Sequence, residues 1–296
     1  MKRISLTNRE SKVAVGAFAK PGDKLWQLIP DILQGRALKQ LVAAVRRAKQ
    51  DTRGIIAGFG AHVIKCGLSP LLIDLMERGF ITALATNGAS LIHDFELALQ
   101  GQTSEDVAHA LKQGTFGMAE ETGAGINRLI NEAARSEIPL YQTIGRHMEE
   151  RAFAHRGLSL FYNAYRLSVP LTVHIAIGTD ITHMHPEASG RSMGAVSFRD
   201  FHAFVDNLKT IHNGGVYLNI GSAVLLPEVF LKAIAMLRNR DMSFGGFSTA
   251  VFDFMRQYRP RENVAQRPQV LDSRGFYFVG HHEHLLPLFY YLLLYG

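Results

Sequence analysis

The stretch GIIAGFGAHVIKCGLSPLLIDLMERGFITALATNGASLIHDFE, residues 54–96, contains two short apolar runs separated by a helical segment. The runs at residues 54–59 and 80–85 lack polar alternation, which is typical of strands buried on both faces. Between them, residues 68–77 carry apolar side chains at helical spacing and end at Gly79. Parallel strands joined by a helix end at the same edge of a sheet, where ligands bind in open α/β folds. We therefore expect a functional site at this edge.

The rest of the chain continues the alternation of strands and helices. Buried runs predict further strands over residues 170–177, 215–220 and 246–254, with short strands near Val270 and over 276–279. Helices are expected between the strands, over residues 24–32, 37–50, 91–99, 118–134, 140–154, 198–211 and 227–237, and at the end over 285–294. Residues 103–106 are expected to cap a further helix that runs through residue 111. This pattern predicts a single α/β domain over residues 23–296, with a doubly wound, mostly parallel sheet and helices on both faces. Residues 1–22 are polar and are expected to form an N-terminal arm.

Composition narrows the class of protein. The chain has 296 residues, a formal net charge of +6 and a single cysteine, Cys66, which excludes an internal disulfide and suits a reducing cytoplasm. No apolar run is long enough to cross a membrane, and the first residues carry no export signal. The basic residues are spread along helices and match no nucleic-acid-binding motif. We therefore expect a cytoplasmic protein that binds neither nucleic acid nor membrane.

Small or polar residues end four of the predicted strands. Such turns let a ligand approach the backbone, and a following helix offers N–H groups to a phosphate. The sequence departs from the usual Gly-x-Gly-x-x-Gly pattern, because the next glycine after Gly60 is Gly67. We nevertheless predict a nucleotide cleft here, and the candidate cofactor-binding residues are Gly58, Gly60, Thr86, Asn87, Gly88, Asp94, Thr179, Gly221 and Ser222.

Three side chains near these turns are candidates for chemistry. His93 and Glu96 lie three residues apart on the helix after Gly88, so they share one face. A histidine titrates near neutrality and serves as a general base, and Glu96 is placed to hold its ring and raise its basicity. Asp180 follows a strand and is placed to pair with a cationic substrate. Acids at a helix start also favour the helix dipole, which explains Asp94 without any catalytic role.

Several segments resemble deoxyhypusine synthases. Residues 86–94 (TNGASLIHD) are similar to the family's Thr-Thr-Ala-Gly-Gly-Val-Glu-Glu-Asp, and residues 125–128 (GINR) match its Gly-Ile-Asn-Arg. Thr179-Asp180 falls on a Thr-Asp at a strand end, and residues 259–264 (RPRENV) resemble its Arg-Pro-x-Glu-x-Val. The likeness runs in order from about residue 54 to the end of the chain. It implies a Rossmann-like fold, a homotetramer, NAD as cofactor and chemistry on a small amine or polyamine.

The departures from this family fall on the residues that carry its chemistry. In that family NAD takes a hydride from spermidine, and a lysine in an Ala-Lys-x-x-Gly segment then carries the aminobutyl group as an imine. Here residues 209–215 read KTIHNGG, with no lysine at that position. His212 cannot form an imine, although its place in this segment makes it a candidate catalytic residue. Ile92 and His93 replace the family's paired glutamates. The resemblance therefore implies an NAD-dependent enzyme that is not a true deoxyhypusine synthase.

Two other readings remain open. His183 and His185 share one side of a loop, and residues 281–284 (HHEH) crowd three more histidines, so a metal-dependent hydrolase on the same scaffold is one alternative. No spacing here matches a standard zinc motif. A non-catalytic nucleotide-binding protein is the other alternative. The closing segment 285–294 is apolar almost all round, which favours a homotetramer.

Overall fold

The computed structural model describes residues 1–5, 8, 13–22 and 24–296. Six strands form one sheet in the order β3-β2-β1-β4-β5-β6, and every neighbouring pair is parallel. Their bounds are β1 Ile55–Phe59, β2 Ala83–Asn87, β3 Leu171–His174, β4 Val216–Ile220, β5 Ser248–Asp253 and β6 Arg274–Val279. This is the strand order of the Rossmann fold, and its direction reverses between β1 and β4. The predicted doubly wound parallel sheet is confirmed.

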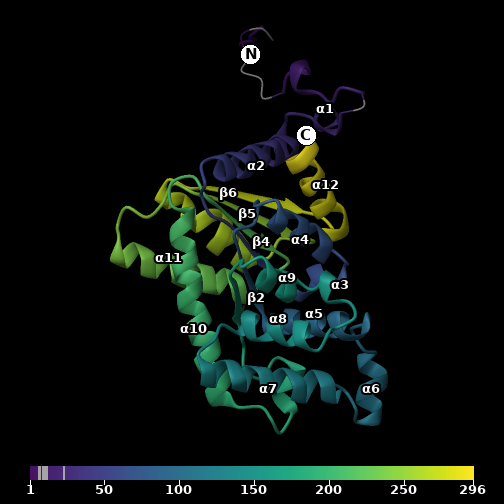
Figure 1. Ribbon diagram of the computed structural model, residues 1–296. Helices are drawn as coiled ribbons and strands as arrows, with labels where there is room; N and C mark the ends of the chain where they lie inside the picture. The colour runs from purple at the N-terminus through teal and green to yellow at the C-terminus, as the bar shows by residue number, and fades with distance from the viewer. Residues whose placement is uncertain (6–7, 9–12, 23) are drawn as a thin grey trace.

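Helices cover both faces of the sheet (Figure 1). α10 and α11 lie against one face, and α2, α4, α5, α9 and α12 cover the other. The helices are α1 Leu25–Leu28, α2 Leu33–Gln50, α3 Ala61–Lys65, α4 Ser69–Glu77, α5 Gly88–Gln100, α6 Val107–Gln113, α7 Glu120–Ser136, α8 Leu140–Glu150, α9 Leu160–Arg166, α10 Gly190–Leu208, α11 Leu225–Arg240 and α12 His282–Tyr295. Short 3-10 turns and a π-helix at Pro260–Gln266 complete the connections.

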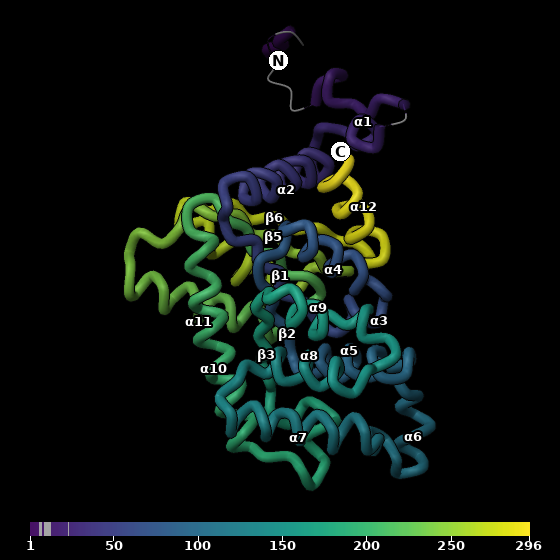
Figure 2. The backbone as a smooth tube through the Cα atoms, viewed as in Figure 1, coloured from purple at the N-terminus to yellow at the C-terminus, as the bar shows by residue number. Residues whose placement is uncertain are grey.

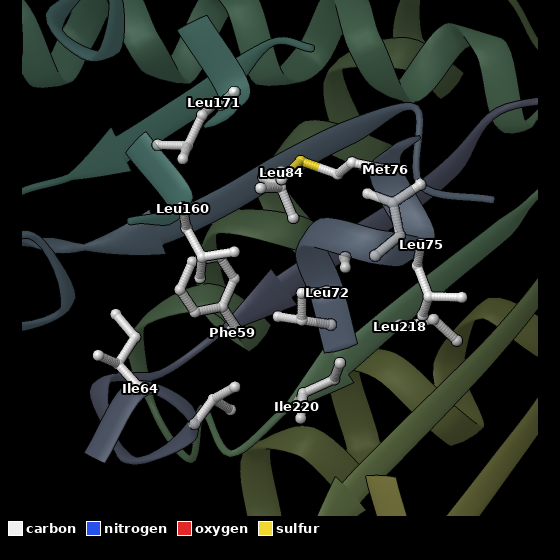
Figure 3. Close-up of a cluster of buried hydrophobic side chains, with 14 of the residues drawn as sticks. Phe59, Ile64, Leu72, Leu75, Met76, Leu84, Leu160, Leu171, Leu218 and Ile220 are labelled. Carbon is white, nitrogen blue, oxygen red and sulfur yellow. The ribbon is translucent and has the colours of Figure 1, made fainter. Parts of the chain in front are cut away.

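Side chains alternate between the two faces of the sheet along each strand, and each face has its own hydrophobic core. Phe59 of β1 packs into the core under α2, α4 and α9, whereas Ile56 packs into the core under α10 and α11. All five residues of β1 and of β4 are buried, as their uninterrupted apolar sequences predict. Figure 3 shows the first core, where Phe59 meets Leu72 of α4, Leu160 of α9 and Ile220 of β4. The carboxyl ends of the central strands β1 and β4 are therefore held by packing on both faces of the sheet.

Some predicted elements are wrong in detail. The strand expected near Val270 is a 3-10 turn, Arg267–Leu271, because this segment lies outside the sheet next to the π-helix. The helix expected over residues 198–211 begins earlier, at Gly190, where the Ser189 hydroxyl caps it. α3 and α9 were not expected. The N-terminal arm predicted for residues 1–22 falls partly outside the described residues, and the division of the chain at residue 22 remains a prediction.

The apolar closing helix α12 is accounted for within one chain. It packs between α2 and α4 (Figure 2) and buries Leu286, Phe289 and Leu292. Arg46 of α2 donates hydrogen bonds of 2.9–3.0 Å to the carbonyl oxygens of Leu292, Leu293 and Gly296 at its end. One side of α12 is therefore buried within the chain, whereas Tyr291 and Tyr295 on the same helix are exposed. The homotetramer stays a prediction. In the described parts of the chain, no helix is both long and apolar enough to cross a membrane.

A buried carboxyl makes stability depend on pH. Asp200 of α10 accepts a 2.7 Å hydrogen bond from the N–H of Val173 in the edge strand β3, and burial raises its pKa to about 7. Because the folded protein holds this proton more tightly than the unfolded chain, stability falls as pH rises from about 4 to 7. Asp200→Asn keeps an acceptor for Val173 and should remove about 3 kcal/mol of the fall that lies between pH 5 and pH 8. Urea unfolding of both proteins at pH 5 and pH 8 measures it, and equal pH dependence would contradict the assignment.

Candidate active site

One pocket at the carboxyl edge of the sheet gathers several of the predicted site residues. It has a volume of about 210 Å³ and lies between α5, the segment after β3 and the loop before α6. The residues that line it are Lys65, Ala89, Ile92, His93, Glu96, Ser104, Glu105, Val107, Phe116, Thr179, Asp180 and Ile181. The structure thus brings His93, Glu96, Thr179 and Asp180 together, although they come from two separate segments of the chain.

The start of α5 explains why Gly88 is a glycine. Asn87 caps the helix, and its side-chain oxygen accepts a 2.9 Å hydrogen bond from the N–H of Ser90. A Cβ atom on Gly88 would lie 1.9 Å from Oδ2 of Asp180, which no real contact allows. The absent side chain therefore makes room for the Asp180 carboxylate at the positive end of the α5 dipole.

Asp180 is held from its other side by His183. Nδ1 of His183 accepts hydrogen bonds from the N–H groups of Gly178 (3.0 Å) and Asp180 (3.3 Å), so the ring proton lies on Nε2. That nitrogen is 3.8 Å from Oδ2 of Asp180. Burial raises the pKa of Asp180, while His183 and then the Thr179 hydroxyl lower it. The pocket therefore contains a nearly buried carboxyl group that a cation would stabilise in its charged form.

His93 and Glu96 share a face of α5, but a threonine stands between them. Nδ1 of His93 lies 2.7 Å from the hydroxyl of Thr103, and that hydroxyl donates to Oε2 of Glu96. The other carboxylate oxygen of Glu96 accepts a 2.9 Å hydrogen bond from Thr122. As expected, Glu96 raises the pKa of His93, but the net shift is downward. Burial and then Lys65 lower the pKa of His93, and together they outweigh Glu96, so the ring is neutral at pH 7.

Sequence reasoning missed three polar residues at this site. Lys65 and Glu105 line the pocket, and the hydroxyl of Thr103 contacts His93 and Glu96. Glu105 also accepts a 2.9 Å hydrogen bond from the N–H of Gly117, which ties the segment before α6 to the start of α7. Lys65 is the last residue of the short helix α3, which was not expected, and Thr103 and Glu105 precede α6, so no turn at a predicted strand end pointed to them.

The candidate cofactor residues after β1 and β4 lie at the reversal point of the sheet, outside this pocket. A Cβ on Gly58 would lie 2.4 Å from the buried Tyr217 hydroxyl, so Gly58 faces the core, not a ligand. A Cβ on Gly60 would lie 2.3 Å from the carbonyl oxygen of Gly221, so these two turns touch. Ser222 is buried, and its hydroxyl accepts from an N–H in the first turn of α11. The structure brings Gly60, Gly221 and Ser222 together.

Asp94 points away from the pocket. Its carboxylate accepts a 2.8 Å hydrogen bond from the N–H of Leu160 and another from the Ser159 hydroxyl at the start of α9. The residue is 1% exposed, and burial raises its pKa to about 6. Asp94 therefore fastens α5 to α9 and is not available to a cofactor.

Thr86 and His212 are also outside the pocket. The Thr86 hydroxyl is fully buried and donates to the carbonyl oxygen of Phe59, which links β2 to β1. His212 precedes β4 and therefore lies at the amino edge of the sheet, where Nδ1 contacts backbone atoms of Gly245 and the ring stacks on Phe244. Since the pocket is at the carboxyl edge, we leave His212 out of the site.

The histidines considered as metal ligands are otherwise engaged. His183 accepts two backbone N–H groups, and Nε2 of His185 lies 2.8 Å from the carbonyl oxygen of Gly117. His282 is buried, with Nε2 3.3 Å from the carbonyl oxygen of Phe252. Across the described residues, no group of three or more His, Cys, Asp or Glu side chains is arranged to hold a metal ion.

Comparison with known proteins adds evidence for the fold. No family model and no curated protein matches the sequence. Among solved structures, unliganded AgrE superposes with a TM-score of 0.58 at 15% identity over 87% of this chain and 32% of that one. AgrE in a ternary complex with ornithine and NAD⁺ gives a TM-score of 0.55 at 15% identity over 87% and 32%.

A third similar structure is ArgZ, an arginine dihydrolase from the ornithine–ammonia cycle in cyanobacteria. It has a TM-score of 0.50 and 18% identity over 88% of this chain and 32% of that one. The chain thus spans about a third of the length of these proteins. At such identities the likeness shows a shared Rossmann-like fold. None of the three is a deoxyhypusine synthase, so that resemblance remains a prediction.

Proposed function

We propose that this chain is an enzyme that binds NAD and oxidises a small amine in the pocket beside α5. The observation that carries the proposal is the neutral His93 imidazole, held by Thr103 and facing a pocket that also contains the carboxylate of Asp180. Such a pair can remove a proton from an ammonium group and hold positive charge at the same time.

The strand order and the turns at its reversal point support NAD as the cofactor. In Rossmann folds a dinucleotide binds where the strand order reverses, which is here between β1 and β4. AgrE, which shares the fold, has been crystallised with ornithine and NAD⁺. Three of the predicted cofactor residues, Gly60, Gly221 and Ser222, meet at this point.

The local geometry fits a phosphate after β4 better than after β1. α3 has only five residues and Gly60 packs on Gly221, so little room or dipole remains there. α11 has 16 residues, and its N-cap residue Val224 makes no side-chain hydrogen bond to the first turn. The backbone from Ser222 to Val224 would therefore hold the pyrophosphate.

The pocket favours a small cationic substrate. Its lining includes three acidic side chains, Glu96, Glu105 and Asp180, against one basic side chain, Lys65. Asp180 would pair with an ammonium group of the substrate. Lys65 would pair with a carboxylate if the substrate carries one, as an amino acid does.

The proposed chemistry needs a base close to the reacting amine. An ammonium nitrogen has no lone pair, so it must lose a proton before the neighbouring carbon can release a hydride. Nε2 of His93 would accept this proton, and the carbon–nitrogen bond would then become an iminium as the hydride leaves. NAD, when bound, supplies the hydride acceptor. No lysine of residues 209–215 takes part, since Lys209 pairs with Asp206 on the surface, so we propose no aminobutyl transfer.

Binding and turnover can be measured directly. We expect NAD or NADP to bind in titration calorimetry at micromolar to millimolar levels, and NADH to appear with L-ornithine, L-arginine or spermidine as trial substrates. Absence of nucleotide binding at millimolar levels would contradict the cofactor assignment. Binding without turnover of any amine would favour the non-catalytic nucleotide-binding protein instead.

A further inference from the structure

We propose that Thr103 is a positioning residue that fixes the tautomer of His93 and so places the lone pair of the ring on Nε2, the nitrogen that is free to face a substrate. This rests on the proposed role of His93 as the base. Thr103 touches no reacting atom in this scheme, and it acts only through the histidine.

The hydroxyl of Thr103 has a single hydrogen to share between two neighbours. Its hydroxyl carries one hydrogen and contacts two partners, Oε2 of Glu96 and Nδ1 of His93, the latter at 2.7 Å. A carboxylate oxygen can only accept, so the hydroxyl hydrogen goes to Glu96. The hydroxyl oxygen must then accept from His93, which requires a hydrogen on Nδ1.

The state of the ring completes the assignment. Burial and Lys65 lower the pKa of His93, and a neutral imidazole carries one N–H only. With that hydrogen on Nδ1, Nε2 keeps its lone pair. Among the described residues, no protein group forms a hydrogen bond with Nε2 of His93, and the residue lines the pocket. The base is therefore ready before the substrate arrives.

The backbone around Thr103 is shaped to present its hydroxyl. Gly101 ends α5 in the left-handed region with φ of 76°, and Ser104 has φ of 71°, a conformation that a non-glycine residue rarely adopts. Glu105 then accepts the N–H of Gly117 at 2.9 Å and anchors the segment. A strained serine beside a fastened glutamate indicates a loop with one specified course, not a variable connection.

Glu96 is fixed independently of Thr103. Its second oxygen, Oε1, accepts a 2.9 Å hydrogen bond from the Thr122 hydroxyl of α7, which makes no contact with His93. Removing the Thr103 hydroxyl therefore leaves the Glu96 carboxylate held by Thr122, but His93 loses its hydrogen bond at Nδ1. Thr122 provides a matched control, because its loss removes a hydrogen bond of the same kind to the same carboxylate without touching the ring.

The experiment compares Thr103→Val, Thr103→Ser and Thr122→Val. Nitrogen-15 NMR of the imidazole reports which ring nitrogen of His93 carries the hydrogen, and it needs neither substrate nor cofactor. We expect the hydrogen on Nδ1 in the unaltered protein, in Thr103→Ser and in Thr122→Val, and a mixture of tautomers in Thr103→Val. With an amine that the enzyme turns over, kcat should fall in Thr103→Val in proportion to the fraction of rings that lose the hydrogen on Nδ1, and by less than in a variant that lacks the base. Thr103→Ser should restore most of it.

The outcomes separate this proposal from the proposed function. A hydrogen on Nε2 of His93 in the unaltered protein overturns the role of Thr103, whatever the activity. The expected tautomers in a protein that oxidises no amine leave the hydrogen-bonded link intact and overturn the function instead. An unchanged tautomer in Thr103→Val also rejects the proposal, because the ring would then be positioned by something else.

Discussion

His93→Ala should lower the turnover of an amine substrate by about 10²–10⁴-fold, the usual contribution of a general base. Among the described residues that line the pocket, His93 is the only histidine. The variant keeps all the turns at the reversal point of the sheet, so its affinity for NAD should stay within a factor of about two. Production of NADH under saturating substrate measures the first quantity, and titration calorimetry measures the second.

A matched control is His109→Ala. This histidine is exposed on α6 and does not line the pocket, so its removal should leave turnover unchanged. If His93→Ala retains full turnover, the base must be another group. Asp180 would then be the next candidate, because burial raises its pKa.

Gly88→Ala should weaken binding of the amine by about 10- to 100-fold, which corresponds to losing a charge-assisted hydrogen bond of about 1.5–3 kcal/mol. The added methyl group would lie 1.9 Å from Oδ2 of Asp180, so the carboxylate must leave the start of α5. Because the substrate ammonium group binds that carboxylate in our proposal, KM should rise. Gly88→Val should abolish binding altogether.

Gly194→Ala is the control for this substitution. Gly194 lies inside α10 with nothing within 4 Å of an added Cβ, and it does not line the pocket. It should leave KM unchanged. An unchanged KM in Gly88→Ala, with the protein folded by circular dichroism, would remove Asp180 from the substrate site.

The sheet could be predicted from the sequence more fully than the pocket could. β1 and β4 are buried on both faces, so their apolar runs predict both their type and the edge at which their turns meet. His93 could be predicted as a site residue because it lies on the first turns of α5, the helix that follows β2 at the carboxyl edge of the sheet. Thr103 was not, because its position depends on the left-handed conformation of Ser104, which is unusual for a serine.

Residues that are neighbours in the sequence turned out to have different roles in the structure. Gly58 and Gly60 look alike in the sequence, but Gly58 lies within β1 and faces Tyr217, whereas Gly60 lies beyond the strand and contacts Gly221. Asp94 is a neighbour of His93, but one position around α5 turns its side chain toward α9. The helix α9 was itself not expected, so a buried partner for that carboxylate could not be predicted.

The central strand pair has a consequence for how the chain folds. β1 and β4 join Ile55 to Val216, whereas the pairs on either side connect strands that are closer in the sequence. Two half-sheets, β3-β2-β1 and β4-β5-β6, can therefore form from their own segments, but the middle of the sheet closes only when they dock. Closing so long a loop costs entropy before any contact compensates, and chains dominated by such distant contacts fold slowly. The turns at Gly60 and Gly221 meet only at that docking step, so the proposed cofactor site would be among the last parts of the molecule to form.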